Sequence, residues 1–98
     1  MSARRVIRVD CNQITSERAF WDTYLNATDA VSPGEFGRNL DALWDAVESD
    51  VPGPGYPGDV DLQFVNCRAI ETLRNGALIS GLRDIAGEVT ERSIEVVI

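Results

Sequence analysis

The sequence predicts an α/β fold in which a three-stranded parallel sheet packs against about four helices in a single pair of layers. Three short segments have the apolar patterns typical of strands, and segments with helical periodicity separate each strand from the next. Strands joined in this way need crossover connections, which favour a parallel sheet covered by helices. With 98 residues, the chain has room for one hydrophobic core and not for two.

The first half of the chain predicts a strand, a helix and a loop. Residues 6–9 form a short apolar run around Arg8, which is typical of a strand. Thr15 or Ser16 can cap the helix that follows, because their hydroxyls accept a hydrogen bond from the first turn. The apolar residues of this helix recur at helical spacing and are predicted to be core residues: Phe20, Trp21, Tyr24 and Leu25. Residues 26–34 are rich in turn-forming types and predict a surface loop.

The second half predicts a second helix, a long loop and further elements of both kinds. The loop at residues 51–60 holds three of the four prolines, which exclude regular structure there. The elements predicted around it are a helix over residues 39–48, a strand over 60–65 followed by Cys67, a short helix around 70–73 that stops near 75–76, a longer helix over 78–89, and a strand over 93–98. Phe64 is predicted to lie in the core, and Tyr56 either packs over the sheet edge or contacts a partner.

Composition and charge restrict the class of partner. The chain is 44% hydrophobic and 26% charged, which is typical of a folded protein, and it carries a net charge of -7. Nucleic acid is not an expected partner, because binding it depends on neutralising phosphates with basic side chains. No apolar run approaches the roughly 20 residues that span a bilayer, and no signal-peptide core follows the start. We therefore expect a cytoplasmic protein with no membrane contact and a basic macromolecule as partner.

The two cysteines, Cys11 and Cys67, each follow a predicted strand. A reducing cytoplasm would keep them as thiols. If the two strands are parallel neighbours, the cysteines approach within bonding distance, so a disulfide is geometrically conceivable. The sequence leaves both states open.

The helix predicted over residues 39–48 carries its charges on one side. Its apolar residues share one arc: Leu40, Leu43, Trp44 and Val47. Asp41, Asp45 and Glu48 share an adjoining arc, and we call these three residues the acidic stripe. Trp44 lies at the boundary, so its ring can join the core and still present an edge beside the carboxylates. On geometry alone, the stripe is better explained as a solvent-exposed face that keeps the protein soluble.

Residues 35–45 read Glu-Phe-Gly-Arg-Asn-Leu-Asp-Ala-Leu-Trp-Asp, and this run resembles the signature of the barstar family, the intracellular inhibitors of secreted microbial ribonucleases. The resemblance implies a single barstar-like domain over residues 1–98. It also implies that the helix and the loop before it block the active cleft of a secreted guanyl-specific ribonuclease. Asp45 matches the family's central aspartate, which occupies the place of the substrate phosphate, and Asp41 matches a second acid that pairs with an arginine.

The expected partner-binding residues follow from this match: Glu35, Phe36, Gly37, Asn39, Asp41, Trp44, Asp45 and Glu48. Gly37 permits a close backbone approach, and Asn39 either bonds across the interface or caps the helix. The chain departs from the inhibitor that gives the family its name at Glu35, where that protein has an aromatic residue, at Arg38, where it has an acid, and at Glu48, which adds a carboxylate. Asp84 or Glu88 is a candidate for the acid that the family's last long helix contributes.

Three functions other than ribonuclease inhibition are also considered for this sequence. An enzyme is not expected, because the chain has no histidine, no nucleophile motif and no phosphate-binding glycine loop, and no small-molecule substrate is implied. A cation could bind the stripe, but no loop supplies the six to eight oxygens that Ca²⁺ needs, so no cofactor is expected. The remaining alternative is a barstar-like acidic module whose partner is a different basic protein or toxin.

Overall fold

Three parallel strands form the single sheet of the computed structural model, which describes residues 5–49 and 51–98. They are β1 (Arg5–Asp10), β2 (Val60–Val65) and β3 (Ile94–Val96), in the order β1-β2-β3. Ile7 pairs with Leu62, which pairs in turn with Ile94. The predicted parallel sheet is confirmed, although β3 is shorter than the predicted strand.

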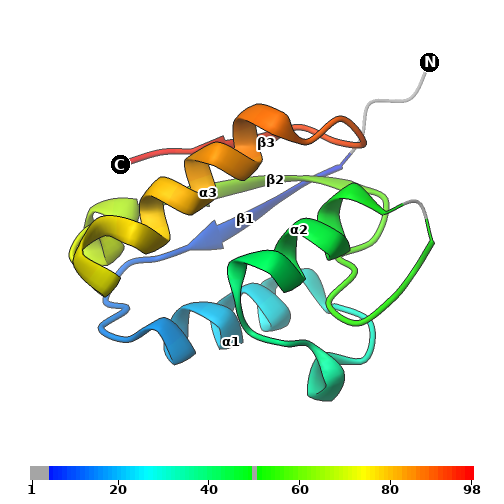
Figure 1. Ribbon diagram of the computed structural model, residues 1–98, viewed down its shortest axis with the longest axis horizontal. Coiled ribbons are helices and arrows are strands. Elements are labelled where there is room, and N and C mark those ends of the chain that lie inside the picture. The colour runs from blue at the N-terminus through cyan, green and yellow to red at the C-terminus, as the bar shows by residue number, and fades with distance from the viewer. Residues whose placement is uncertain (1–4, 50) are drawn as a thin grey trace.

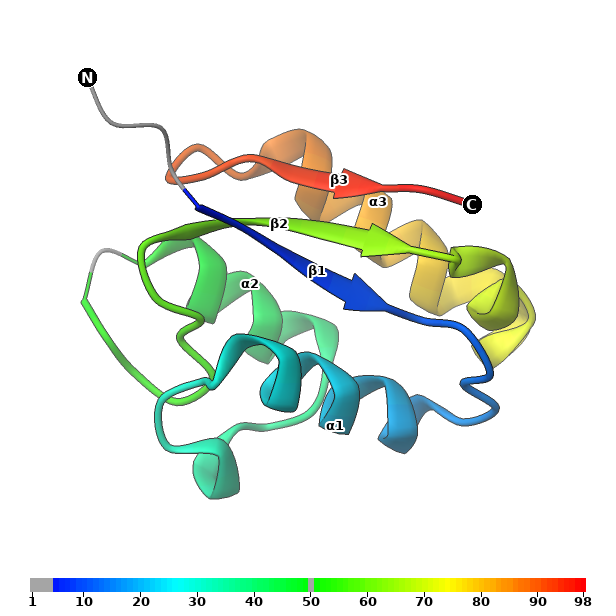
Figure 2. The same cartoon turned by 180° about the vertical axis from the view of Figure 1, so that it is seen from behind.

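The helices α1 (Glu17–Thr28), α2 (Leu40–Glu48) and α3 (Ala77–Glu88) cover one face of this sheet. α3 stands in front of the strands in Figure 1 and behind them in Figure 2, where the other sheet face is open to the viewer, and α1 lies below β1 in both views. Buried and more exposed side chains alternate along the strands, as expected for a sheet with helices on one face. Val9, Leu62, Phe64 and Ile94 are buried under the helices, while the residues between them are more exposed.

The prediction of about four helices is wrong, because the described residues contain three α-helices. The segment predicted as a short helix around residues 70–73 forms two 3₁₀ turns instead, Cys67–Ile70 and Leu73–Gly76. Arg74, Asn75 and Gly76 have positive φ values of 52°, 55° and 89°. Three successive residues in the left-handed region end any right-handed helix, so the chain reverses there before α3 begins.

Five aromatic rings form the centre of the core. Phe20 packs edge-on against Trp21 with 4.8 Å between ring centroids, and it stacks on Phe64 at 5.8 Å. Tyr24 also stacks on Phe64, and Phe36 contacts both Trp21 and Tyr24 at 5.8 Å. The predicted burial of the four rings from α1 and β2 is confirmed. Phe36 is an addition, and it ties the loop before α2 to α1.

The proline-rich segment before β2 is irregular, as predicted, but buried side chains hold it in place. The Tyr24 hydroxyl donates a hydrogen bond to the Gly55 carbonyl at 2.8 Å. Arg92, which is only 8% exposed, donates to the carbonyls of Val47, Gly58 and Val60 at 2.7 to 2.9 Å. These bonds join the end of α2, the loop and the start of β2.

A candidate partner-binding site on helix α2

The first turn of α2 is fixed by one amide side chain. Asn39 is the N-cap, and its Oδ1 accepts a hydrogen bond from the Ala42 backbone N–H at 2.7 Å. Its Nδ2 donates to the Gly37 carbonyl at 3.1 Å. A Cβ at Gly37 would lie 3.2 Å from the Ala42 Cβ. The cap role predicted for Asn39 is present, and the close approach at Gly37 is made to the helix itself.

The buried face of α2 sets its position on the sheet and against α3. Leu43, Ala46 and Val47 are buried in the core. Where α2 meets α3, a Cβ at Gly81 would lie only 2.4 Å from Leu40 Cδ1, so the side chain of Leu40 packs directly on the backbone of α3. A helix held by its cap and by three buried side chains presents its outer residues in a fixed orientation.

Two members of the acidic stripe, Asp41 and Asp45, project into solvent from this rigid helix. Both residues are exposed. Within residues 5–49 and 51–98, neither carboxylate has a hydrogen-bond or ion-pair partner. Asp41 lies in the first turn, where the helix dipole favours a negative charge. The two carboxylates are one helical turn apart and are therefore available together to an external cation.

The third member, Glu48, has a different environment. Its Oε1 accepts hydrogen bonds from the backbone N–H and the hydroxyl of Thr90, both at 2.9 Å, and from the backbone N–H of Glu91 at 3.1 Å. The Thr90 backbone bond is the main cause of a lowered pKa for this carboxyl. The structure therefore gives Glu48 an internal role, because one of its oxygens holds the loop between α3 and β3.

A shallow groove runs between α2 and α3 beside the stripe. Its volume is about 300 Å³, and we call it the acidic groove. It is lined by Leu40, Asp41, Trp44, Gly81, Asp84, Ile85 and Glu88. Trp44 is half-buried and packs against the core, in agreement with its predicted boundary position. The groove thus combines an apolar floor with exposed carboxylates contributed by both helices.

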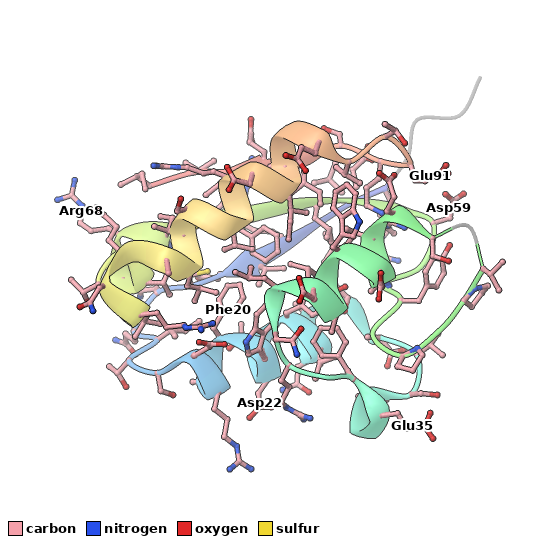
Figure 3. The ribbon with its side chains drawn as sticks, viewed as in Figure 1. Phe20, Asp22, Glu35, Asp59, Arg68 and Glu91 are labelled. Atoms are coloured by element: carbon pink, nitrogen blue, oxygen red, sulfur yellow. The ribbon has the colours of Figure 1, made fainter. Side chains whose placement is uncertain are left out.

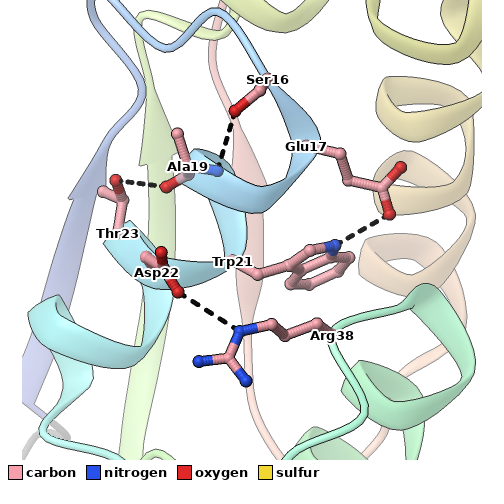
Figure 4. Close-up of polar contacts among 7 residues, drawn as sticks. All are labelled: Ser16, Glu17, Ala19, Trp21, Asp22, Thr23 and Arg38. Carbon is pink, nitrogen blue, oxygen red and sulfur yellow. Dashed lines mark hydrogen bonds and ion pairs between the residues drawn. The ribbon is translucent and has the colours of Figure 1, made fainter.

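The residues just before α2 differ in their accessibility. Phe36 is only 4% exposed, so it holds the loop from inside the core. Glu35 is exposed at the end of a short 3₁₀ turn and points away from α2 in Figure 3. Arg38 has a positive φ of 49°, and its Nε donates to Asp22 Oδ1 on α1 at 3.3 Å (Figure 4). The basic side chain is thereby held to α1 by this ion pair.

The arrangement can recognise a basic surface. Carboxylates on a rigid helix accept short, charge-assisted hydrogen bonds from arginine or lysine, and an adjacent apolar floor can pack against the aliphatic part of such side chains. No cluster of three or more potential metal ligands occurs in the described part of the chain. No helix among the described residues is long and apolar enough to cross a membrane.

The comparison with protein families gives one match, to the family described as "Barstar (barnase inhibitor)", over residues 4–98. The chain belongs to the barstar family. Membership indicates a ribonuclease-inhibitor role and a ribonuclease as partner, and members of the barstar family are inhibitors and not enzymes. A search of curated proteins found no match.

Sequence reasoning placed Glu48 on the partner-binding surface and missed its internal bonds, and it did not single out Arg92. Both residues act through partners more than 30 residues away in the sequence, which no local pattern reveals. Gly81 did leave a signal, because a glycine inside a helix often marks a close approach to another element. The groove between α2 and α3 could have been anticipated from that residue.

Proposed function

We propose that this chain is a stoichiometric inhibitor of a secreted guanyl-specific ribonuclease and that α2 blocks the active cleft by imitating the phosphates of RNA. One observation carries the proposal. In a chain of the barstar family, Asp41 and Asp45 stand exposed, one turn apart on a capped helix, and neither has a partner among the residues that the structure describes. Like charges at this spacing weaken a helix, so the pair is better explained by an external cation than by stability.

Asp45 is the centre of the proposed contact and Asp41 its neighbour on the side of the acidic groove. A ribonuclease cleft holds an anionic substrate with basic side chains, and carboxylates presented by a rigid helix can take the same bonds. The backbone at Gly37 and the ring of Trp44 lie at the edge of this surface. Asp84 and Glu88 extend it across α3, where either can pair with a further basic residue of the enzyme.

The structure refines the other proposed contacts. The Oε1 atom of Glu48 already accepts hydrogen bonds from Thr90 and Glu91, so Glu48 can offer the partner mainly its other carboxylate oxygen. Phe36 and Asn39 contribute by holding the loop and the helix start. We therefore rank the eight proposed residues in two groups, with Asp41, Trp44 and Asp45 as direct contacts and the others as lesser contacts or supports.

The test is an inhibition titration against the guanyl-specific ribonuclease secreted by the source organism. The wild-type protein should reach full inhibition at one inhibitor per enzyme. Asp45→Ala should weaken binding by about 2 kcal/mol, or roughly thirtyfold in Kd, because basic groups of the enzyme lose charge-assisted bonds. A loss below about 1 kcal/mol would contradict the central role of Asp45.

A charge-matched control separates specific contact from general attraction. Asp45→Asn and Glu71→Gln change the net charge equally. Glu71 is exposed and comes three residues after Arg68, which lies far from α2 in Figure 3. Only Asp45→Asn should weaken inhibition strongly. Association of the wild-type protein should also slow as salt is raised, since long-range steering is screened beyond about 10 Å at 0.1 M salt.

The alternative partner, a different basic protein or toxin, makes a distinct prediction. If guanyl-specific ribonucleases are not inhibited, a pull-down from the source organism compared with an Asp41/Asp45 double variant should recover a basic protein of another kind. Arg38 supports this alternative, because a cation stands three residues before Asp41, where the inhibitor that gives the family its name has an acid.

A further inference from the structure

Two cysteines that are far apart in the sequence meet at the carboxyl ends of β1 and β2. The strands are parallel neighbours up to the pair Asp10 and Val65. Cys11 donates its backbone N–H to the Val65 carbonyl at 2.9 Å, and Cys67 donates to the Val97 carbonyl at 3.0 Å. Both backbones are therefore tied to the sheet just beyond the paired residues.

A left-handed residue turns the second cysteine toward the first. Leu62 and Phe64 face the core, so strict alternation would place the side chain of Asn66 inward. Asn66 instead has a φ of 56° and is exposed, and the residue after it points into the core. Cys11 and Cys67 are both completely buried as a result.

Both sulfur atoms are free thiols, and Cys11 Sγ donates a weak hydrogen bond to the Val9 carbonyl at 3.9 Å. Interaction with the neighbouring Cys67 thiol, together with burial, raises the pKa of Cys11, so its proton is held firmly. The same interaction lowers the pKa of Cys67, which makes its sulfur the better nucleophile of the two. The proposed function uses neither thiol.

We propose that Cys11 and Cys67 form a redox-modifiable pair that closes to an internal disulfide when a peroxide reaches it. Cys67 sulfur attacks one peroxide oxygen, the O–O bond breaks, and the thiol proton leaves with the other oxygen as water. Cys11 sulfur then attacks the sulfur of the Cys67 sulfenic acid and expels hydroxide, which takes the Cys11 proton and leaves as a second water. Two thiols are oxidised by two electrons, and one peroxide is reduced.

The position of the pair decides what the disulfide does. The closed loop from residue 11 to residue 67 contains α1, α2 and the proline-rich segment. A cross-link of this length restricts the unfolded chain strongly. The exposed carboxylates on α2 are not involved, so the oxidised protein keeps the same binding surface on a scaffold that is harder to unfold. This inference does not depend on the identity of the partner.

The experiment treats the full-length protein with hydrogen peroxide under native conditions and follows the intact mass and the peptide map. We expect a loss of two hydrogen atoms, a peptide joining Cys11 to Cys67, and a rise in the urea midpoint of roughly 2 M that dithiothreitol reverses. Cys67→Ser, treated identically, should form no internal cross-link. Sulfinic or sulfonic acids without a cross-link, intermolecular dimers, or a cross-link that forms only in denaturant would each overturn the proposal.

Discussion

Replacing Arg92 by methionine tests whether a single buried cation holds α2 to the rest of the molecule. Its Nε donates to the Val47 carbonyl at the end of α2, and its Nη1 donates to the carbonyls of Gly58 and Val60. The guanidinium also lies over the ring of Tyr56 at 5.6 Å. Methionine keeps the apolar stem of the side chain and removes every donor, so three carbonyls lose their partner.

The magnitude follows from these three bonds. A hydrogen bond from a charged donor contributes about 1.5 kcal/mol at the lower end of its range, which gives about 4.5 kcal/mol for three. Two of the bonds are partly open to water, which can replace them in part, so we expect a loss of about 3 kcal/mol in the free energy of unfolding. At an m-value of about 1.5 kcal/mol/M, the urea midpoint falls by about 2 M.

The assay is urea unfolding followed by the fluorescence of Trp21 and Trp44. Arg92→Lys should fall between the wild-type protein and Arg92→Met, because one ammonium cannot span acceptors that two guanidinium nitrogens reach. Arg83→Met, at an exposed arginine of α3, controls for the change of charge. A loss below about 1 kcal/mol in Arg92→Met would refute the inference that these bonds hold the two segments together.

Three further predictions concern neighbouring supports. Tyr24→Phe should cost about 1 to 2 kcal/mol in unfolding free energy, measured by urea titration, because the Gly55 carbonyl loses a buried donor at 2.8 Å. Gly55→Ala should cost about 3 kcal/mol in the same assay, since φ is +81° and the new Cβ would lie 2.1 Å from Phe36 Cδ1; an unchanged midpoint would show that the loop can move aside. The pKa of Glu48 is lowered by its bonds from Thr90, so its contribution is present above about pH 4.5 and is lost as the pH falls through the folded-state pKa. The urea midpoint of Glu48→Gln should accordingly fall less steeply on acidification than that of the wild-type protein, and equal slopes would contradict the linkage.

The parts of the fold that the sequence predicted are those with local causes. Asn39 and the apolar spacing of α2 are sufficient to place that helix, because a cap and a periodic face both act within a few residues. The strands were predictable for the same reason. The missing fourth helix was not, since Asn75 and Gly76 mark an end in the sequence but no local pattern shows that Arg74 also takes a left-handed conformation.

The same distinction between local and distant causes applies to the candidate site. Asp41 and Asp45 were predictable as a pair from helical spacing, and the family signature assigned them a purpose. The internal bonds of Glu48 were not predictable, because Thr90 lies 42 residues away in the sequence. A helical wheel places three carboxylates together but does not show which of them forms hydrogen bonds with a distant segment of the same chain.

The close contact between Leu40 and Gly81 has a consequence for how this protein can change. The contacts that orient α2 are made by its cap and its inner face, while Asp41, Asp45, Asp84 and Glu88 stand outside them. Substitutions at these four positions therefore cost little in folding, so under the proposed function a lineage can exchange one partner for another by surface mutations alone. The same four positions define a compact library for selecting new binders on an unchanged scaffold.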